Sequence, residues 1–152
     1  MSVLAAGTPA PEFTLLKADG EKFTREDVLG KTTVLVFYPF AFSGGCTEQL
    51  TTYEGVLADF TERGATLYAV STDARFSQTA FREQLASSIE QLSDFEPKGA
   101  AASAFGALHA AGMTNRALVV IGPDGVVKWS WEAPTPGQLP GPELVLEGLA
   151  AV

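Results

Sequence analysis

Three short apolar runs, rich in β-branched and aromatic residues, most constrain what this 152-residue chain can fold into. They are Thr33–Tyr38, Thr66–Ser71 and Arg116–Ile121. The first run lacks the polar alternation of a strand with one face in water, so it predicts a strand buried on both faces. Segments with helical spacing lie between the runs. The pattern predicts a sheet with helices on either side.

Turn signals add strands at both ends of this sheet. Asp19-Gly20 predicts a hairpin between residues 13–15 and 21–23, and Thr24 is expected to cap a short helical turn. Gly122–Gly125 predicts a turn into a strand over residues 127–131, antiparallel to the third run. The order is that of an α/β protein with a thioredoxin-like fold, a central mixed sheet flanked by helices and an N-terminal hairpin extension. No boundary is visible, so residues 1–152 are expected to form a single domain.

Apolar spacing predicts the main helices. One helix is expected from the first turn around Cys46 to about Glu62, and the next is expected to begin at a cap formed by Thr72 or Asp73. A short helix over residues 100–105 and a final helix after Pro142 complete the pattern. The apolar positions expected on the second helix are Phe76, Ala80 and Leu85, and those on the final helix are Leu144, Val145, Leu149 and Val152.

Charge and cysteine content exclude several classes of function. The net charge of −8 argues against nucleic acid or an anionic membrane as a partner, because both need a basic surface. A single cysteine rules out an internal disulfide framework. No His/Cys/Asp cluster has the spacing of metal ligands. The N-terminal residues do not resemble a signal peptide and no apolar stretch is long enough to span a membrane, so a cytoplasmic location is expected.

Cys46 lies at the junction between the first buried strand and the following helix. Free N–H groups and the helix dipole stabilise a thiolate in a first helical turn. Gly44 and Gly45 remove side chains beside the sulfur, Ser43 offers a hydroxyl, and Pro39 stiffens the entrance to the loop. The residues alone leave two interpretations open, a reactive thiol and a small buried hydrophobe.

Pro39, Ser43 and Cys46 match the Pro-x-x-x-Thr/Ser-x-x-Cys signature of peroxiredoxins. The chain most resembles the one-cysteine peroxiredoxins of the alkyl hydroperoxide reductase E subfamily. Further segments that resemble this family, in the same order along the chain, are Val70–Asp73, Leu92–Phe95 and Met113–Val120.

The resemblance implies a thiol-specific peroxidase that reduces hydrogen peroxide, organic hydroperoxides and peroxynitrite. It implies that the Cys46 thiolate attacks the peroxide and becomes a sulfenic acid. Arg116 would favour the thiolate and bind the peroxide. Ser43 would hydrogen-bond the peroxide or the sulfur, the N–H groups of Gly45 and Cys46 would add donors, and Pro39 would shield the site from water.

Three positions, Ser43, Glu96 and Gln49, depart from the resembled pattern. Ser43 stands where threonine is more common, which keeps the hydroxyl but loses the methyl group that orients it. Glu96 stands where the subfamily has an aromatic residue at the pocket rim. The subfamily's glutamate corresponds to Gln49 in this chain, and Glu48 is interpreted as a helix-stabilising acidic residue outside the site.

A single cysteine implies reduction from outside the chain, by mycothiol, glutathione or a redoxin protein. No cofactor is expected, and the resemblance implies a homodimer. Two alternatives remain, a non-catalytic redox sensor that uses the same thiol and a thioredoxin-fold interaction module with an inert cysteine. A thiol–disulfide oxidoreductase is disfavoured because Cys-x-x-Cys is absent, and His109 is expected on the surface.

Overall fold

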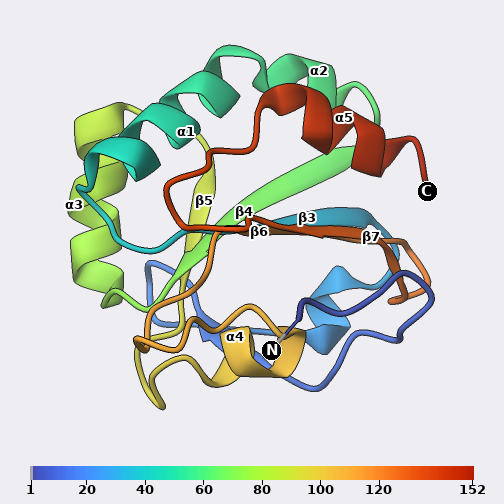
Figure 1. The fold of residues 1–152 in the computed structure, drawn as a ribbon, viewed down its shortest axis with the longest axis horizontal. Helices are drawn as coiled ribbons and strands as arrows, with labels where there is room; N and C mark the ends of the chain where they lie inside the picture. Colours follow the sequence, from blue (N-terminus) through green and yellow to red (C-terminus); the bar gives the residue numbers. More distant parts are fainter. Residues whose placement is uncertain (1) are drawn as a thin grey trace.

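The computed structural model describes residues 2–152 and is built on one twisted seven-stranded sheet (Figure 1). The strand order is β2-β1-β5-β4-β3-β6-β7. The pairs β3/β4 and β4/β5 are parallel, and the other four pairs are antiparallel, so the predicted mixed sheet is confirmed. The strands are β1 Thr14–Leu16, β2 Lys22–Thr24, β3 Thr32–Phe37, β4 Ala65–Ser71, β5 Glu90–Ser93, β6 Ala117–Ile121 and β7 Val127–Glu132.

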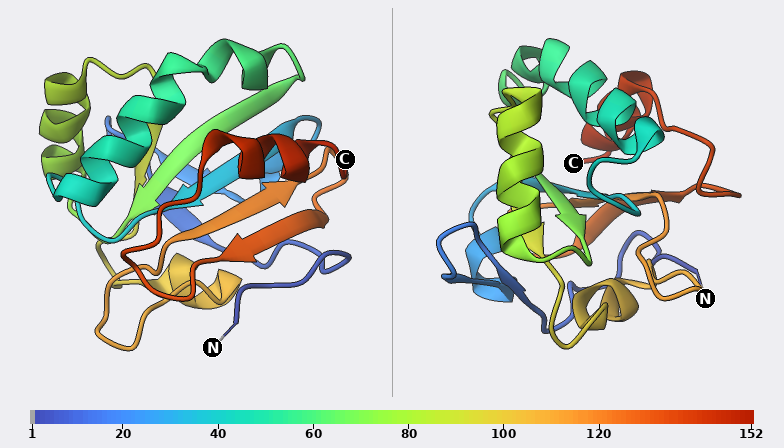
Figure 2. Two further views of the ribbon diagram at one scale, coloured as in Figure 1. Left: turned by 45° about the horizontal axis from the view of Figure 1, so that its top comes forward. Right: turned by 90° about the vertical axis from the view of Figure 1, so that its left-hand side faces the viewer.

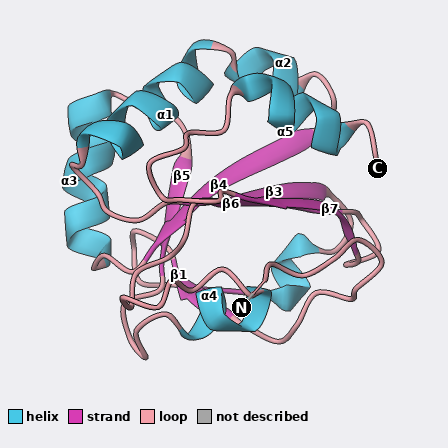
Figure 3. Ribbon diagram, in the orientation of Figure 1, coloured by secondary structure: helices cyan, strands magenta, loops and turns pink. Residues whose placement is uncertain are grey.

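Helices cover both faces of the sheet. Helices α1, α2, α3 and α5 lie on one face, and α4 with the short η1 lies on the other (Figures 2 and 3). The bounds are η1 Arg25–Val28, α1 Gly44–Gly55, α2 Leu57–Thr61, α3 Arg75–Leu85, α4 Ala100–Phe105 and α5 Pro142–Leu149. None of the helices within residues 2–152 has the length and apolar character needed to cross a membrane.

Strand β3 separates two apolar cores, as its sequence predicts. Val34 and Val36 pack in the core under α1, α2 and α5, whereas Leu35 and Phe37 pack in the opposite core with Phe105 of α4. All four strand residues are completely buried. Because successive side chains of a strand point to opposite faces, a run buried on both sides must be apolar at every position.

The predicted helix from Cys46 to Glu62 is wrong in one respect, because the structure divides it. Helix α1 ends at Gly55, and Val56 has φ −124° and ψ 17°, outside the helical range. Glycine costs about 1 kcal/mol relative to alanine in a helix interior and valine is also a weak helix former. The break aims Phe60 of α2 into the core, where its ring meets that of Tyr53 edge to face.

The start and the buried face of α3 also differ from expectation. The N-cap is Ala74, with no side-chain cap, because the carboxylate of Asp73 bonds elsewhere. Phe76 is 70% exposed and Ala80 is exposed, while Phe81 is completely buried. The helix begins at Arg75, and this phase turns the ring of Phe81 into the core. At the other end of the chain, Val152 lies beyond α5 and is exposed.

Candidate active site

Sheet register brings the cysteine loop, residues 39–43, next to the segment that carries Arg116. Strand β3 ends at Phe37, which pairs with Ala117 at the start of the antiparallel strand β6. The loop leaves the sheet at the point where Arg116 enters it. The Thr114 hydroxyl also donates to the carbonyl of Tyr38, which fastens the two segments together. Residues about 70 positions apart in the sequence therefore lie at the same end of two neighbouring strands.

Cys46 is the third residue of α1 and is completely buried. Ser43 is the N-cap of this helix, and its Oγ accepts a hydrogen bond from the Cys46 N–H at 3.4 Å. The same hydroxyl donates to the carbonyl of Phe40 at 3.1 Å. Serine is among the best N-cap residues because its side-chain oxygen satisfies an unpaired donor of the first turn. The structure thus gives Ser43 a capping function that the sequence analysis missed.

Two backbone donors remain open beside the sulfur. In the part of the chain that the structure describes, the N–H groups of Gly44 and Gly45 have no acceptor. The first N–H groups of a helix carry partial positive charge and attract anions. An oxyanion that forms near Cys46 would therefore meet donors that are already in place.

Arg116 is 4% exposed and lies directly over Gly45. Its Nε donates to the carbonyl of Pro136 at 2.6 Å, and its Nη1 donates to Oε1 of Gln49 at 2.7 Å. Its Nη2 is 3.2 Å from the point where a Cβ on residue 45 would stand. Among residues 2–152 this Nη2 has no hydrogen-bond acceptor, so it faces the first turn of α1 with free donors.

Gln49 and Tyr53 belong to the site, although the sequence analysis did not include them. Gln49 Nε2 donates to the Tyr53 hydroxyl at 3.4 Å, and that hydroxyl donates to the carbonyl of Pro140 at 2.8 Å. Both side chains are buried. The available signal was a glutamine at i and a tyrosine at i+4, which share a helix face and reach one another. Burial raises the pKa of the Tyr53 phenol far above its ordinary value, so the hydroxyl stays protonated and donates.

The cysteine loop is held by contacts to α3 and to the end of β4. The Asp73 carboxylate accepts from the Ala41 N–H at 2.8 Å and from the Ser71 hydroxyl at 2.7 Å. Phe42 has φ 69°, a left-handed value that is unfavourable for a bulky residue, and its ring packs 5.2 Å from that of Phe81. Pro39 is buried at the start of the loop. These contacts fix a backbone that would otherwise relax.

Other residues singled out in the sequence lie away from this cluster. Glu48 is exposed. Glu96 lines a separate hollow of about 210 Å³ together with Phe76 and Phe95. His109 is half-exposed on a loop, where its Nδ1 accepts from the Ala111 N–H. Residues 2–152 contain no group of three or more His, Cys, Asp or Glu side chains placed to hold a metal ion.

Comparison with known proteins gives consistent results. The model of the AhpC/TSA family matches residues 6–130. Alkyl hydroperoxide reductase E of Mycobacterium tuberculosis is 30% identical over 152 residues, with 99% of each chain covered. The solved structure of Enterococcus faecalis AhpC is 26% identical, with a TM-score of 0.85 over 99% of this chain and 92% of that one. A peroxiredoxin-like protein of Aquifex aeolicus, 22% identical, has the same fold, with a TM-score of 0.86 over 100% of this chain and 90% of that one.

Proposed function

Since this chain belongs to the AhpC/TSA family and is a thiol peroxidase of the one-cysteine peroxiredoxin type, we propose that Cys46 is its peroxidatic residue. The thiolate attacks one oxygen of the hydroperoxide. A sulfur–oxygen bond forms, the O–O bond breaks, and its electron pair leaves with the second oxygen. That oxygen takes up a proton to become an alcohol, or water when the substrate is hydrogen peroxide. The protein keeps a sulfenic acid.

One observation carries this assignment: the free Nη2 of Arg116 lies over Gly45, beside the buried Cys46. A buried guanidinium favours a nearby thiolate and stabilises the negative charge that develops on the leaving oxygen. The open N–H of Gly45 serves the same oxygen. Pro39 excludes water from the loop entrance. Ser43 orients the first turn of α1 through its cap, and its hydroxyl is expected to turn to a bound peroxide.

The sulfenic acid needs an external reductant, because the chain holds no second cysteine. Two thiols restore it. The first displaces water to form a mixed disulfide with Cys46, and the second releases the free thiol of the protein and a disulfide product. A low-molecular-weight thiol such as mycothiol or glutathione, or a redoxin protein, fits this chemistry.

The expected cytoplasmic location and the single domain over residues 1–152 stay predictions.

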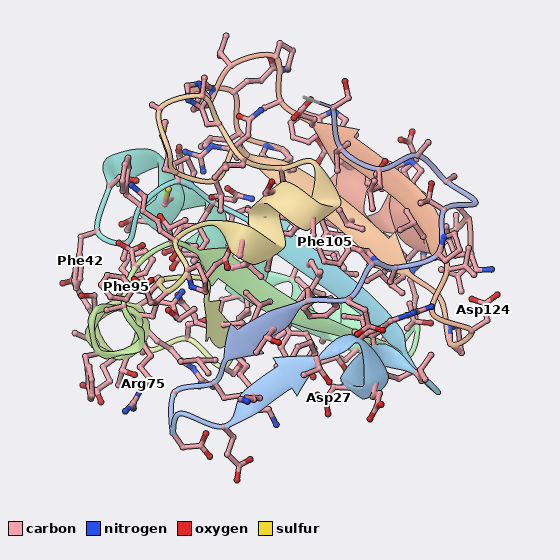
Figure 4. All side chains as sticks on the ribbon, turned by 90° about the horizontal axis from the view of Figure 1, so that it is seen from below. Asp27, Phe42, Arg75, Phe95, Phe105 and Asp124 are labelled. Carbon is pink, nitrogen blue, oxygen red and sulfur yellow. The ribbon has the colours of Figure 1, made fainter. Side chains whose placement is uncertain are left out.

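A homodimer is the assembly that we propose, and exposed aromatic side chains around the start of α3 support it. Phe42 and Phe95 project from the side of the molecule where α3 is seen end-on (Figure 4), and Phe76 lines a hollow with Phe95. Phe40 and Phe42 are each 49% exposed. Exposed apolar side chains that lie together often mark an interface between proteins. Sedimentation equilibrium of the native protein and of a Phe42→Ser/Phe95→Ser variant tests the assignment, since the variant should be monomeric.

The central test is the second-order rate of oxidation by hydrogen peroxide. Tryptophan fluorescence in stopped flow follows the rate, and mass spectrometry identifies the sulfenic acid. We expect a rate orders of magnitude above that of a free thiol, abolished in Cys46→Ser and strongly lowered in Arg116→Ala. A rate like that of a free thiol would refute the assignment and favour the interaction module. Fast oxidation without turnover by any added thiol or redoxin would favour the redox sensor.

A further inference from the structure

Arg116 is a buried cation without an acidic partner. Its guanidinium donates hydrogen bonds to the backbone carbonyl of Pro136 and to the amide oxygen of Gln49, and both acceptors are neutral. The ion pairs found within residues 2–152 are Arg25–Glu12 and Lys128–Asp124, both elsewhere on the surface. Buried charges are normally paired, because removing a charge from water is costly. No negative side chain among the described residues therefore neutralises Arg116, and its positive charge can act on a molecule that enters the site.

The hydrogen bonds that hold Arg116 run in one direction. Arginine can only donate, so Gln49 must present its carbonyl oxygen to Arg116 and its NH₂ group to Tyr53. The Tyr53 hydroxyl then has one proton, which it donates to Pro140. The chain of donors Arg116→Gln49→Tyr53→Pro140 ties the guanidinium to residues 134–141 and contains no formal negative charge.

A carboxylate at position 49 would conflict with this relay. Glutamate has no N–H, so its second oxygen would face the lone pairs of the Tyr53 oxygen. Tyr53 could relieve the repulsion only by turning its single proton away from Pro140, which would leave a buried carbonyl without a donor. Tyr53 therefore selects a neutral, amide-bearing residue at position 49.

The nearby acidic side chains do not pair with Arg116. Glu48 and Glu143 are exposed to solvent, where their charges are largely screened, and the Glu143 carboxylate acts on the site only as a minor contribution to the raised pKa of Tyr53. The Asp73 carboxylate bonds the Ala41 N–H and the Ser71 hydroxyl on the other side of the cysteine loop. With the Cys46 thiolate formed, the pair of thiolate and guanidinium is neutral; a glutamate at position 49 would make the cluster negative.

We propose that Gln49, oriented by Tyr53, determines the charge specificity of this peroxidase, because its neutral amide beside Arg116 penalises anionic peroxides less than a carboxylate would. The inference rests on the proposed function and adds the substrate class. An anion meets no repelling carboxylate next to Arg116, so its approach to the thiolate is penalised less than in a site with a glutamate. The reacting step is unchanged: the thiolate takes one oxygen, and the electron pair of the O–O bond leaves on the anionic fragment.

The test compares two oxidants of different charge. Hydrogen peroxide is neutral, and peroxymonosulfate is a monoanion at neutral pH that leaves as sulfate. The second-order rate of Cys46 oxidation is measured for each, and the ratio of the anionic to the neutral rate is compared between variants. Two like unit charges about 8 Å apart, at an effective dielectric constant of about 20, change a rate by at least about tenfold. We therefore expect Gln49→Glu to lower the ratio by this factor.

Two variants separate charge from other effects. Thr51→Glu adds the same charge on the exposed face of the same helix, and the ratio should stay within about twofold of the native value. Tyr53→Phe breaks the relay without changing charge, so both rates should fall while the ratio holds. A change of ratio in Tyr53→Phe as large as that in Gln49→Glu would overturn the charge assignment.

An unchanged ratio in a Gln49→Glu protein with native circular dichroism would overturn the inference. If that variant does not fold, Arg116→Gln replaces it and must lower the same ratio; an unchanged ratio there overturns the inference equally. The failure of the proposed function looks different. In that case the native protein reacts with hydrogen peroxide no faster than a free thiol, and Cys46→Ser changes nothing.

Discussion

Gly44 and Gly45 occupy the first two positions of α1, and the structure predicts opposite consequences for the same substitution at each. A Cβ on Gly44 would meet nothing within 4 Å. A Cβ on Gly45 would stand 3.2 Å from Nη2 of Arg116 and 3.4 Å from Cδ2 of Leu139. Neither glycine has a positive φ, so alanine fits the backbone at both positions. The only difference between Gly44→Ala and Gly45→Ala is therefore the contact with Arg116 and Leu139.

The size of the effect follows from these distances. Carbon and its non-bonded neighbours are most stable about 3.5–4.0 Å apart, so Arg116 must move by a few tenths of an ångström. Displacing a catalytic group by about 1 Å can cost about 100-fold in rate. We therefore expect Gly45→Ala to lower the second-order rate with hydrogen peroxide by about 3- to 10-fold. The free energy of unfolding should change by less than about 1 kcal/mol, since alanine is the better helix former.

Stopped-flow fluorescence at several peroxide concentrations measures the rate, and urea unfolding measures the stability. Gly44→Ala is the matched control and should keep the native rate. Equal rates for native protein, Gly44→Ala and Gly45→Ala would refute the placement of Arg116 over Gly45. A Gly45→Ala protein that loses activity only because it unfolds would be recognised by its lowered urea midpoint.

Three other substitutions test the surroundings of the site. Asp73→Ala removes one hydrogen bond to the cysteine loop and one to Ser71 of β4, so urea unfolding should show a loss of about 2–4 kcal/mol and the peroxide rate should fall. Phe105→Ala leaves a cavity in the core between the sheet and α4 and should lower the free energy of unfolding by about 3–5 kcal/mol. The folded fraction should keep the native peroxide rate. Burial disfavours the Glu54 carboxylate, but hydrogen bonds from Ser88 and Ser87 outweigh it and lower its pKa below 4.5. Its stabilisation is therefore present above pH 4.5 and is lost as the pH falls through the lowered value, so Glu54→Gln should reduce the difference in urea midpoint between about pH 6 and about pH 3; an unchanged difference would contradict this.

Local sequence was sufficient for most of the strands and for the position of Cys46. Thr33–Tyr38 could be predicted as a doubly buried strand because it lacks the alternation of polar and apolar residues that a strand with one face in water shows. The same run, followed by Gly44-Gly45 and a helical spacing, located Cys46 in the first turn of a helix. The spacing of Pro39, Ser43 and Cys46 indicated the family without any tertiary information.

Tertiary structure alone decided which groups surround the sulfur. Arg116 reaches Gly45 because β3 and β6 are antiparallel with Phe37 opposite Ala117, a register that no local pattern encodes. The buried face of α3 was likewise mispredicted from spacing. Both Phe76 and Phe81 are apolar, and only the packing of the helix on the sheet decides that Phe81 is buried and Phe76 is exposed. The partners of Gln49 and Tyr53 lie on segments 67 and 87 residues away in the sequence. Hydrogen-bond partners of buried polar groups are set by which distant segments the folded core brings within 3 Å, and the sequence by itself specifies only that such partners must exist.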